Sequence, residues 1–379
     1  MPVRAAERVG LKRVDACDVV VIGGGLVGAW VAARCAREGR HTAVLEALEV
    51  AGGATGRSTG LVLAGLALPY ARTVARYGRE LAREIWNMTL EGRQQIVAAA
   101  EALAVPLQRT GSLAVASEPD EADVLSESAR LLQEDGFDVW FGHSDPLQRG
   151  FHAALRSPHD ITLNAAELTQ ALLESTRASN PIVVHEGTEV FGLQAEGRGV
   201  RVWARGRTVL CEMCFIAVDG CAPLLDRYFA DKVALARGLT LATEPLGYRA
   251  LERPCTACNG QVYCRQLPDR RLLLGAWRRP EQAEGESTDD DALMALLARF
   301  AARHFPEVRT HSVERWSGVS GFTLDDLPLV GQLPDLPAVH FALGLGGRGL
   351  AMAAVAAERM ADFALMGSDP GLLSAARVG

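Results

Sequence analysis

Residues 17–47 read CDVVVIGGGLVGAWVAARCAREGRHTAVLEA, and this stretch decides the fold of the N-terminal part of the chain. A short apolar run, Val19–Ile22, stops at three glycines, and helix-forming residues then continue to Arg37. A second short apolar run, Thr42–Leu45, ends at Glu46. The order of strand, glycine turn, helix and strand fits within about thirty residues, the length of one βαβ unit. The sequence therefore predicts a Rossmann-like start to the fold.

The glycines in this stretch have the G-x-G-x-x-G spacing of a dinucleotide-binding turn. Gly23 permits the tight turn, Gly25 lets a pyrophosphate approach the helix N-terminus, and Gly28 lets the helix pack closely on the strand. Glu46 is expected to accept hydrogen bonds from the ribose hydroxyls of an adenosine. Its charge disfavours a cofactor with a 2′-phosphate, because two anions would then lie side by side. The turn alone fits NAD and FAD equally well.

Composition and charge favour a protein that acts on small molecules. The 379 residues, 49% of them hydrophobic, suffice for two or three structural units with sizeable cores. With 39 Lys and Arg against 46 Asp and Glu, the net charge of −7 gives no broad electrostatic reason to bind nucleic acid or an anionic membrane. The first seventeen residues lack an apolar core of signal-peptide length, and no later apolar run is long enough for a membrane anchor. We therefore expect a cytoplasmic protein.

Two C-x-x-C pairs, Cys211 with Cys214 and Cys255 with Cys258, have a spacing that zinc and iron–sulfur sites use. Cys211 and Cys214 fall in TVLCEMCFIAV, which is predicted to be a strand. Positions three apart on a strand point to opposite faces and cannot chelate one ion without a turn. We therefore expect no metal site and interpret these cysteines as small buried hydrophobic residues.

The remaining chain alternates helical and strand patterns around a glycine-rich loop. The loop is GGATGRSTG, Gly52–Gly60, whose backbone is open to a ligand. Helical patterns cover residues 77–104, 164–179 and 289–304. Strand patterns cover residues 182–196, 200–220 and 239–277, with turns at NG and PDR, and the tail from Val339 has the order strand, glycine turn, helix.

Four stretches carry a resemblance to a known family. They are DVVVIGGGLVGAW; GGATGRSTG; RGLTLATEPL with VYCRQLPDRRLLLGAWR; and WSGVSGFTLDDLPLVGQLPDLPAVHFALGLGGRGL. On these stretches the chain resembles the glycine oxidase and D-amino acid oxidase (DAO) family of flavoenzymes, which includes sarcosine oxidases and glutamylputrescine-type oxidases. The likeness runs from Asp18 to about Leu365. It implies that FAD is the cofactor, and that the C–N bond of a small amine or amino acid is oxidised to an imine by hydride transfer to flavin N5.

The resemblance also implies an α/β plus α+β fold with two domains. A Rossmann-like FAD-binding domain of the glutathione reductase type is expected to combine residues 15–65, 150–232 and 325–370. A substrate-binding domain, built on an antiparallel sheet, is expected to combine residues 66–149 and 233–324.

FAD is expected to lie along the first glycine turn, the GGATGRSTG loop and the loop Gly344–Leu350. A glycine-rich turn that opens a helix points N–H groups and a positive dipole end at its ligand, which suits the negative charge on a reduced flavin. The residues expected at the cofactor are Gly23, Gly25, Leu26, Val27, Gly28, Glu46, Ala47, Arg57, Ser58, Thr59, Val190, Gly346, Gly347, Arg348, Gly349 and Leu350.

Three departures from the family's pattern bear on the reaction. Ser320 stands where glycine oxidase-like members have a carboxylate-binding arginine, so glycine is expected to be a poor substrate. No cysteine lies at the position that tethers the flavin in sarcosine oxidase-like members, so FAD is expected to be non-covalent. Leu273 stands where those oxidases have the lysine that promotes reaction with oxygen, which leaves both oxygen and a quinone open as electron acceptors.

The catalytic candidates are Tyr263 and Arg265, which share a strand face, and Arg348, which stands where many relatives have histidine. A guanidinium could clamp a substrate carboxylate through two hydrogen bonds, although Arg265 fits a surface charge on an edge strand equally well. His340, like the other seven histidines, has no sequence context that marks a general base. A neutral amine can give up hydride without a strong protein base, because the cofactor carries the chemistry.

Two alternatives stay open at this point. The same fold could oxidise a 2-hydroxy acid, since fold alone does not fix function. The chain could also be the flavoprotein subunit of a heteromeric dehydrogenase, with the C-x-x-C pairs as interaction or cluster sites. An oligomer fits either alternative.

Overall fold

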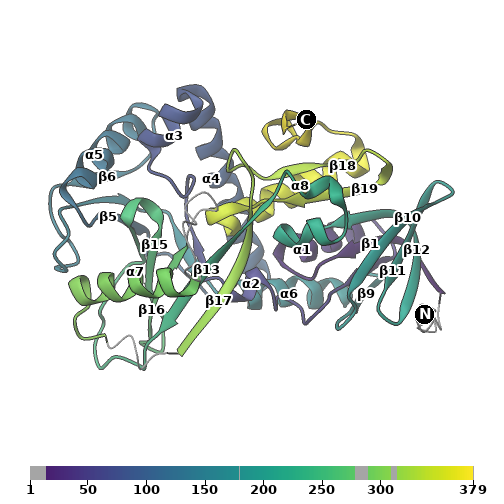
Figure 1. Ribbon diagram of the computed structural model, residues 1–379, viewed down its shortest axis with the longest axis horizontal. Helices are drawn as coiled ribbons and strands as arrows, with labels where there is room; N and C mark the ends of the chain where they lie inside the picture. The colour runs from purple at the N-terminus through teal and green to yellow at the C-terminus, as the bar shows by residue number, and fades with distance from the viewer. Residues whose placement is uncertain (1–13, 179, 278–288, 309–313, 379) are drawn as a thin grey trace, which may run out of the picture.

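The computed structural model describes residues 14–178, 180–277, 289–308 and 314–378. Residues 1–13, where we expected no signal peptide, and Ser179 and Arg278, which end two predicted stretches, lie outside the described residues. Figure 1 shows two halves side by side, each built around one large sheet. No helix in the described ranges is long and apolar enough to cross a membrane.

The first sheet is the dinucleotide-type half. Its order is β10-β11-β12-β1-β2-β9, and β19 pairs with both β12 and β18. β1 lies parallel to both β2 and β12, β2 is parallel to β9, and β12 is parallel to β19, which confirms the predicted βαβ start. Its strands are β1 (Val14–Ile22), β2 (Thr42–Leu45), β9 (Ile182–His185), β10 (Val190–Glu196), β11 (Gly199–Ala204), β12 (Arg207–Ile216), β18 (Leu329–Leu333) and β19 (Leu336–Leu343).

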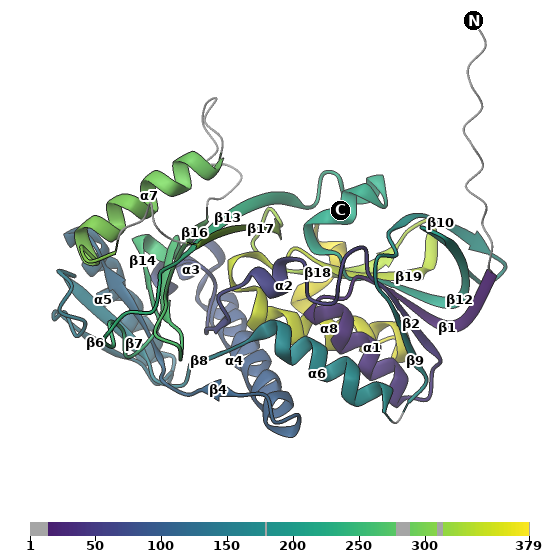
Figure 2. The ribbon, with the colours of Figure 1, turned by 90° about the horizontal axis from the view of Figure 1, so that it is seen from below.

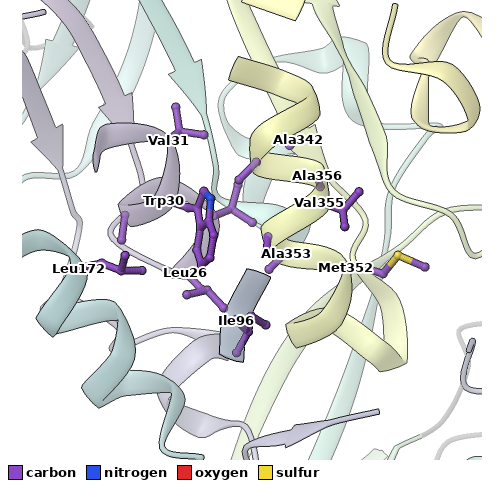
Figure 3. Packing of buried hydrophobic residues seen from close by; sticks show 14 of the residues in the cluster. Leu26, Trp30, Val31, Ile96, Leu172, Ala342, Met352, Ala353, Val355 and Ala356 are labelled. Carbon is purple, nitrogen blue, oxygen red and sulfur yellow. The ribbon is translucent and has the colours of Figure 1, made fainter. Parts of the chain in front are cut away.

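Four helices pack together beside this sheet: α1 (Leu26–Arg37), α4 (Arg79–Ala102), α6 (Ala165–Arg177) and α8 (Gly349–Met366). Helices α1, α6 and α8 contact its strands, and α4 packs on α8. Figure 3 shows Trp30 directed from α1 toward α8, with Ile96 of α4 and Leu172 of α6 nearby. The indole N–H of Trp30 donates to Glu358 at 2.7 Å. A Cβ on Gly92 would lie 1.8 Å from the carbonyl oxygen of Ala351, so only glycine lets α4 approach α8 this closely.

The second sheet forms the other half, in the order β17-β13-β16-β15-β14-β5-β7-β6. All its pairs are antiparallel except β14 with β5. Figure 2 shows α7 (Asp289–His304) and α5 (Pro119–Glu134) on different sides of it, as their separate core clusters require. Its strands are β5 (Ser112–Ala116), β6 (Trp140–Gly142), β7 (Ala153–Ser157), β13 (Ala234–Ala242), β14 (Cys255–Ala257), β15 (Val262–Gln266), β16 (Leu272–Trp277) and β17 (Glu314–Phe322).

Short elements join the two halves. A three-stranded sheet combines β3 (Leu61–Val62), β8 (Ile161–Leu163) and β4 (Leu107–Gln108), while α2 (Ala54–Arg57) and α3 (Tyr70–Tyr77) lie along the connection that contains β3. A parallel-type sheet beside a largely antiparallel one confirms the predicted α/β plus α+β class. The domain boundaries stay a prediction. Strand β7 pairs within the second sheet, although it falls in the predicted segment 150–232.

The helical predictions differ from the structure mainly at their ends. The pattern at 77–104 becomes α4, which begins two residues later because the backbone turns at Gly78 with φ +81° and separates α4 from α3. The pattern at 164–179 becomes α6, with Asn164 as its N-cap accepting from the amides of Ala166 and Glu167. The pattern at 289–304 matches α7 residue for residue.

The prediction that Cys211 and Cys214 point to opposite faces of their strand is wrong. Both side chains pack into one core cluster together with Val209 and Ile216, so the strict alternation of β12 is interrupted between the two cysteines. Burial and the adjacent Cys211 thiol raise the pKa of Cys214 well above its ordinary value. Among the described residues, no group of three or more His, Cys, Asp or Glu side chains is arranged to hold a metal ion.

Candidate active site

The glycine turn forms a close contact between β1 and α1 that side chains would obstruct. Gly23 has φ +106°, and a Cβ there would lie 2.5 Å from the carbonyl oxygen of Ala217. A Cβ on Gly28 would lie only 1.9 Å from the carbonyl oxygen of Gly23. Gly25 is the N-cap of α1 and supplies no side chain there, so the first amides of the helix face outward from the turn. This cradle fits a pyrophosphate.

Glu46 lies at the end of β2, beside the glycine turn. One carboxylate oxygen accepts from the amide of Gly24 at 2.6 Å, and the other accepts from the amide of Leu48 at 2.8 Å. These two bonds hold the carboxylate where the ribose of a bound dinucleotide is expected. Ala47 next to it is exposed, and Val190 is buried at the start of β10.

Leu26 and Val27 lie buried at the start of α1. The amide of Leu26 donates to the hydroxyl of Thr55 at 3.1 Å, which brings the GGATGRSTG loop to the helix N-terminus. Sequence reasoning missed Thr55, although its place in that loop was a signal. Two segments that are predicted to bind the cofactor thus meet at one point.

The rest of the GGATGRSTG loop is tied to the second sheet. Arg57 donates from Nη1 to the carbonyl of Ser317 at 2.9 Å, and its own carbonyl accepts from the indole of Trp316 at 3.0 Å. Ser58 ends α2 as its C-cap, and Thr59 follows it. These contacts place the loop against β17.

Arg265, a catalytic candidate, supports the same loop from β15. Its Nη1 donates to the carbonyl of Thr59 at 2.6 Å and to the carbonyl of Leu163 at 2.9 Å. The side chain is only 7% exposed, and burial lowers its pKa to about 10. It is therefore a buried support for the loop and not a solvated charge, and it is not among the residues that line the cavities described below.

Tyr263, the second candidate on β15, lies in an aromatic cluster. Its ring lies over Gly275, where a Cβ would come within 1.9 Å of it, and its hydroxyl is 3.2 Å from that of Thr240. Trp277 and Phe322 stack nearby, with ring centroids 5.0 Å apart. This cluster faces the loop before α8, since a Cβ on Gly347 would lie 3.0 Å from the Trp277 ring.

A buried carboxylate fixes the start of the predicted flavin loop. Asp219, just after β12, accepts from the amides of Gly344 at 2.8 Å, Leu345 at 3.1 Å and Gly321 at 2.6 Å. Burial raises its pKa, while these amides oppose that effect. Sequence reasoning missed Asp219 because its partners lie about a hundred residues away. The remaining loop amides, from Gly346 to Leu350, lie where the short turn Gly346–Arg348 runs into α8.

Arg348 stands between two hollows. The larger has an empty volume of about 660 Å³, including space open to solvent, and the smaller has about 250 Å³. Arg348 and Leu66 line both. The Nε of Arg348 donates to the carbonyl of Leu66 at 3.3 Å. Burial lowers its pKa to about 10, and the nearby charge of Asp160 acts in the opposite direction.

Residues 18–363 match the DAO family of FAD dependent oxidoreductases. The chain belongs to this family. Among its relatives, the probable oxidoreductase OrdL of Haemophilus influenzae is 23% identical, with 95% of this chain and 85% of that protein covered. Glycine oxidase of Geobacillus kaustophilus is 25% identical, with 91% and 92% covered. The crystal structure of that glycine oxidase superposes with a TM-score of 0.77 over 95% of this chain and 98% of that one, at 21% identity.

The match confirms the predicted family and makes FAD the cofactor of this oxidoreductase. The described residues fit it, because the glycine turn brings β1 and the N-terminus of α1 into close contact and Glu46 lies beside that turn, where a ribose is expected. The individual cofactor contacts stay predictions.

His340 is a buried, neutral histidine of this DAO-family protein, located on β19. Its ring lies against Phe215 and Phe363, and its Nδ1 has no hydrogen-bond partner among the described residues. Burial lowers its pKa from 6.5 to about 4. It therefore stays uncharged at neutral pH and has no carboxylate to make it a strong base.

This burial predicts a loss of stability in mild acid. The contribution of neutral His340 is complete above pH 6.5 and disappears as the pH falls toward about 4, because protonation then favours the unfolded chain. The two pKa values differ by an amount equivalent to about 3 kcal/mol. Urea unfolding at pH 7 and pH 4.5 should show a smaller acid-induced loss for His340→Phe than for the natural chain. The exposed His159→Asn variant is the control, and an identical loss in both variants would contradict the assignment.

Proposed function

We propose that this protein oxidises the C–N bond of an amine that carries a carboxylate, such as an amino acid, to an imine. The observation that supports this is the position of Arg348, whose side chain lines both hollows at the end of the predicted flavin loop. A guanidinium there can bind a carboxylate through two parallel hydrogen bonds. Relatives named glycine oxidase and gamma-glutamylputrescine oxidoreductase agree with a C–N substrate.

The cofactor fits along the junction of the two halves. The first amides of α1 would hold the pyrophosphate, Glu46 the ribose, and the amides from Gly346 to Leu350 the pyrimidine edge of the flavin. When bound, FAD accepts two electrons from the substrate carbon. The protein supplies position and a partly closed, largely apolar site.

Arg348 would orient the substrate by its carboxylate, so that the carbon that bears nitrogen is presented from the larger hollow toward the smaller one. The lining of the larger hollow includes no histidine or lysine among the described residues. Its two carboxylates, Asp160 and Glu121, are engaged by protein donors. The amine would react in its neutral form, having lost its proton to solvent before it enters. Leu63 and Leu66 give the larger hollow part of its apolar lining.

The test uses the purified holoprotein under anaerobic conditions. Loss of flavin absorbance is expected with amino acids and not with the matching 2-hydroxy acids. A 2-hydroxy acid carries the same carboxylate for Arg348, so bleaching by hydroxy acids alone would overturn the proposal in favour of alcohol oxidation. Subsequent admission of oxygen or a soluble quinone identifies the acceptor by which of the two restores the absorbance faster.

Non-covalent binding of FAD has its own expected result. Acid precipitation of the yellow holoprotein should release FAD into the supernatant, because no cysteine is available at the tethering position. Flavin that stays in the washed pellet would contradict this expectation.

A further inference from the structure

We propose that the substrate carries a large apolar, preferably aromatic, side chain in addition to its carboxylate. This inference rests on the proposed function, since it assumes that Arg348 binds the carboxylate. It concerns the larger hollow, which lies on the substrate-domain side of Arg348 and extends between α4, α5, β5 and β14.

The wall of this hollow is mostly apolar, and its empty volume of about 660 Å³ includes space that is open to solvent. Its apolar lining consists of Leu63, Leu66, Leu68, Trp86, Val115, Leu125, Leu132 and Leu155, with several alanines between them.

Aromatic rings form part of the wall and are held in place. Tyr70 meets Trp86 edge to face at 5.4 Å between centroids, and Phe137 packs against both. Trp86 lies against Gly65, which has φ +76° and where a Cβ would come within 2.4 Å of the indole. A further ring from the substrate could pack against these edges and faces, an arrangement that is favourable beyond its buried area.

Several polar groups in the wall already have partners inside the protein. Asp160 accepts from Arg93, from the Ser112 hydroxyl and from the Ala64 amide. The hydroxyl of Tyr70 donates to Asp135.

Glu121 accepts from the Ser117 amide and from Asn259, and it sits in the first turn of α5, where a carboxylate stabilises the helix N-terminus. Arg348 differs from these groups, because within the described residues its hydrogen bond comes from Nε alone. Its two terminal nitrogens can therefore bind one anion beside a mainly apolar space.

Binding of non-reacting carboxylates tests the pocket without turnover. Isothermal titration of the holoprotein should show 3-phenylpropanoate binding roughly thirtyfold tighter than propanoate, because burying the additional phenyl group is favourable. Anaerobic flavin bleaching should be faster with phenylalanine and leucine than with alanine or glycine, tested as both enantiomers.

Two variants fill the hollow from neighbouring strands. Ala114→Leu on β5 and Ser157→Leu on β7 should each reduce the preference for 3-phenylpropanoate over propanoate at least tenfold. Ala195→Leu, on an exposed position of β10, is the matched control and should keep the full preference. Flavin content and melting temperature show which variants are folded. If Ala114→Leu does not fold, Ser157→Leu alone tests the pocket.

The outcomes separate this inference from the proposed function. Equal affinity of the natural chain for propanoate and 3-phenylpropanoate would overturn the apolar pocket, whatever the reaction is. Faster bleaching by 1,4-diaminobutane than by phenylalanine would overturn it in favour of a cationic side chain near Glu121. A third outcome is bleaching by 3-phenyllactate but not by phenylalanine, while 3-phenylpropanoate still binds more tightly than propanoate. It would overturn the proposed function and support the apolar pocket.

Discussion

Replacing Gly28 with alanine is expected to remove most of the bound FAD. The added methyl group would lie 1.9 Å from the carbonyl oxygen of Gly23, so α1 must move away from the turn that it closes. Such overpacking costs about 1–3 kcal/mol. If this strain falls mainly on the amides that face the pyrophosphate, the dissociation constant for FAD rises roughly 5- to 150-fold. Titration of the apoprotein with FAD, followed by flavin fluorescence, measures it.

Gly247→Ala is the matched control for this change. Gly247 is exposed, and a Cβ there would meet no heavy atom within 4 Å among the described residues. It should bind FAD as the natural chain does. A Gly28→Ala protein with unchanged FAD affinity would show that the start of α1 does not hold the cofactor.

The dinucleotide-type half could be predicted from sequence because its signals are local. Gly23, Gly28 and Glu46 lie within one βαβ unit, and their roles follow from backbone geometry that one short stretch determines. Helix α7 could be predicted for a similar reason, since its helical pattern is bounded within sixteen consecutive residues.

Features that depend on tertiary contacts could not be predicted in this way. Asp219 binds the predicted flavin loop across more than a hundred residues, and Arg265 reaches carbonyls in two distant segments. The positions of Cys211 and Cys214 depend on an interruption of β12 that the amino-acid pattern does not reveal. A buried polar group and an irregular strand both depend on neighbouring residues from distant parts of the chain. Those neighbours are known only once the chain is folded.

The structure favours one of the two roles that the sequence allowed for Arg348. Its place before α8 allowed two roles, one toward the flavin, where a positive charge would stabilise the reduced form, and one toward the substrate. The structure directs its Nε to the carbonyl of Leu66 and brings its charge near Asp160, which lines the larger hollow. Leu66 lines both hollows, so it is the proximity to Asp160 that favours the role toward the substrate.

Replacing Arg348 with methionine is therefore expected to weaken binding of carboxylate ligands by about 10- to 150-fold. This range corresponds to the loss of about 1.5–3 kcal/mol that is typical for hydrogen bonds to charged groups. Methionine keeps most of the apolar stem, so the pocket itself should remain. Titration of the holoprotein with 3-phenylpropanoate measures the loss, and Arg348→Lys should recover part of it, because one charge returns without the two parallel hydrogen bonds.

Phenethylamine, which is phenylalanine without its carboxylate, provides an internal comparison. Its rate of flavin bleaching should change much less in the Arg348→Met variant than the rate with phenylalanine. Arg299→Met, on an exposed position of α7, controls for loss of one positive charge and should leave both ligands unaffected. The flavin midpoint potential should also stay close to that of the natural chain. A drop of some tens of millivolts, where roughly 30 mV equals about 1.4 kcal/mol, with unchanged ligand affinity would instead place the Arg348 charge at the flavin.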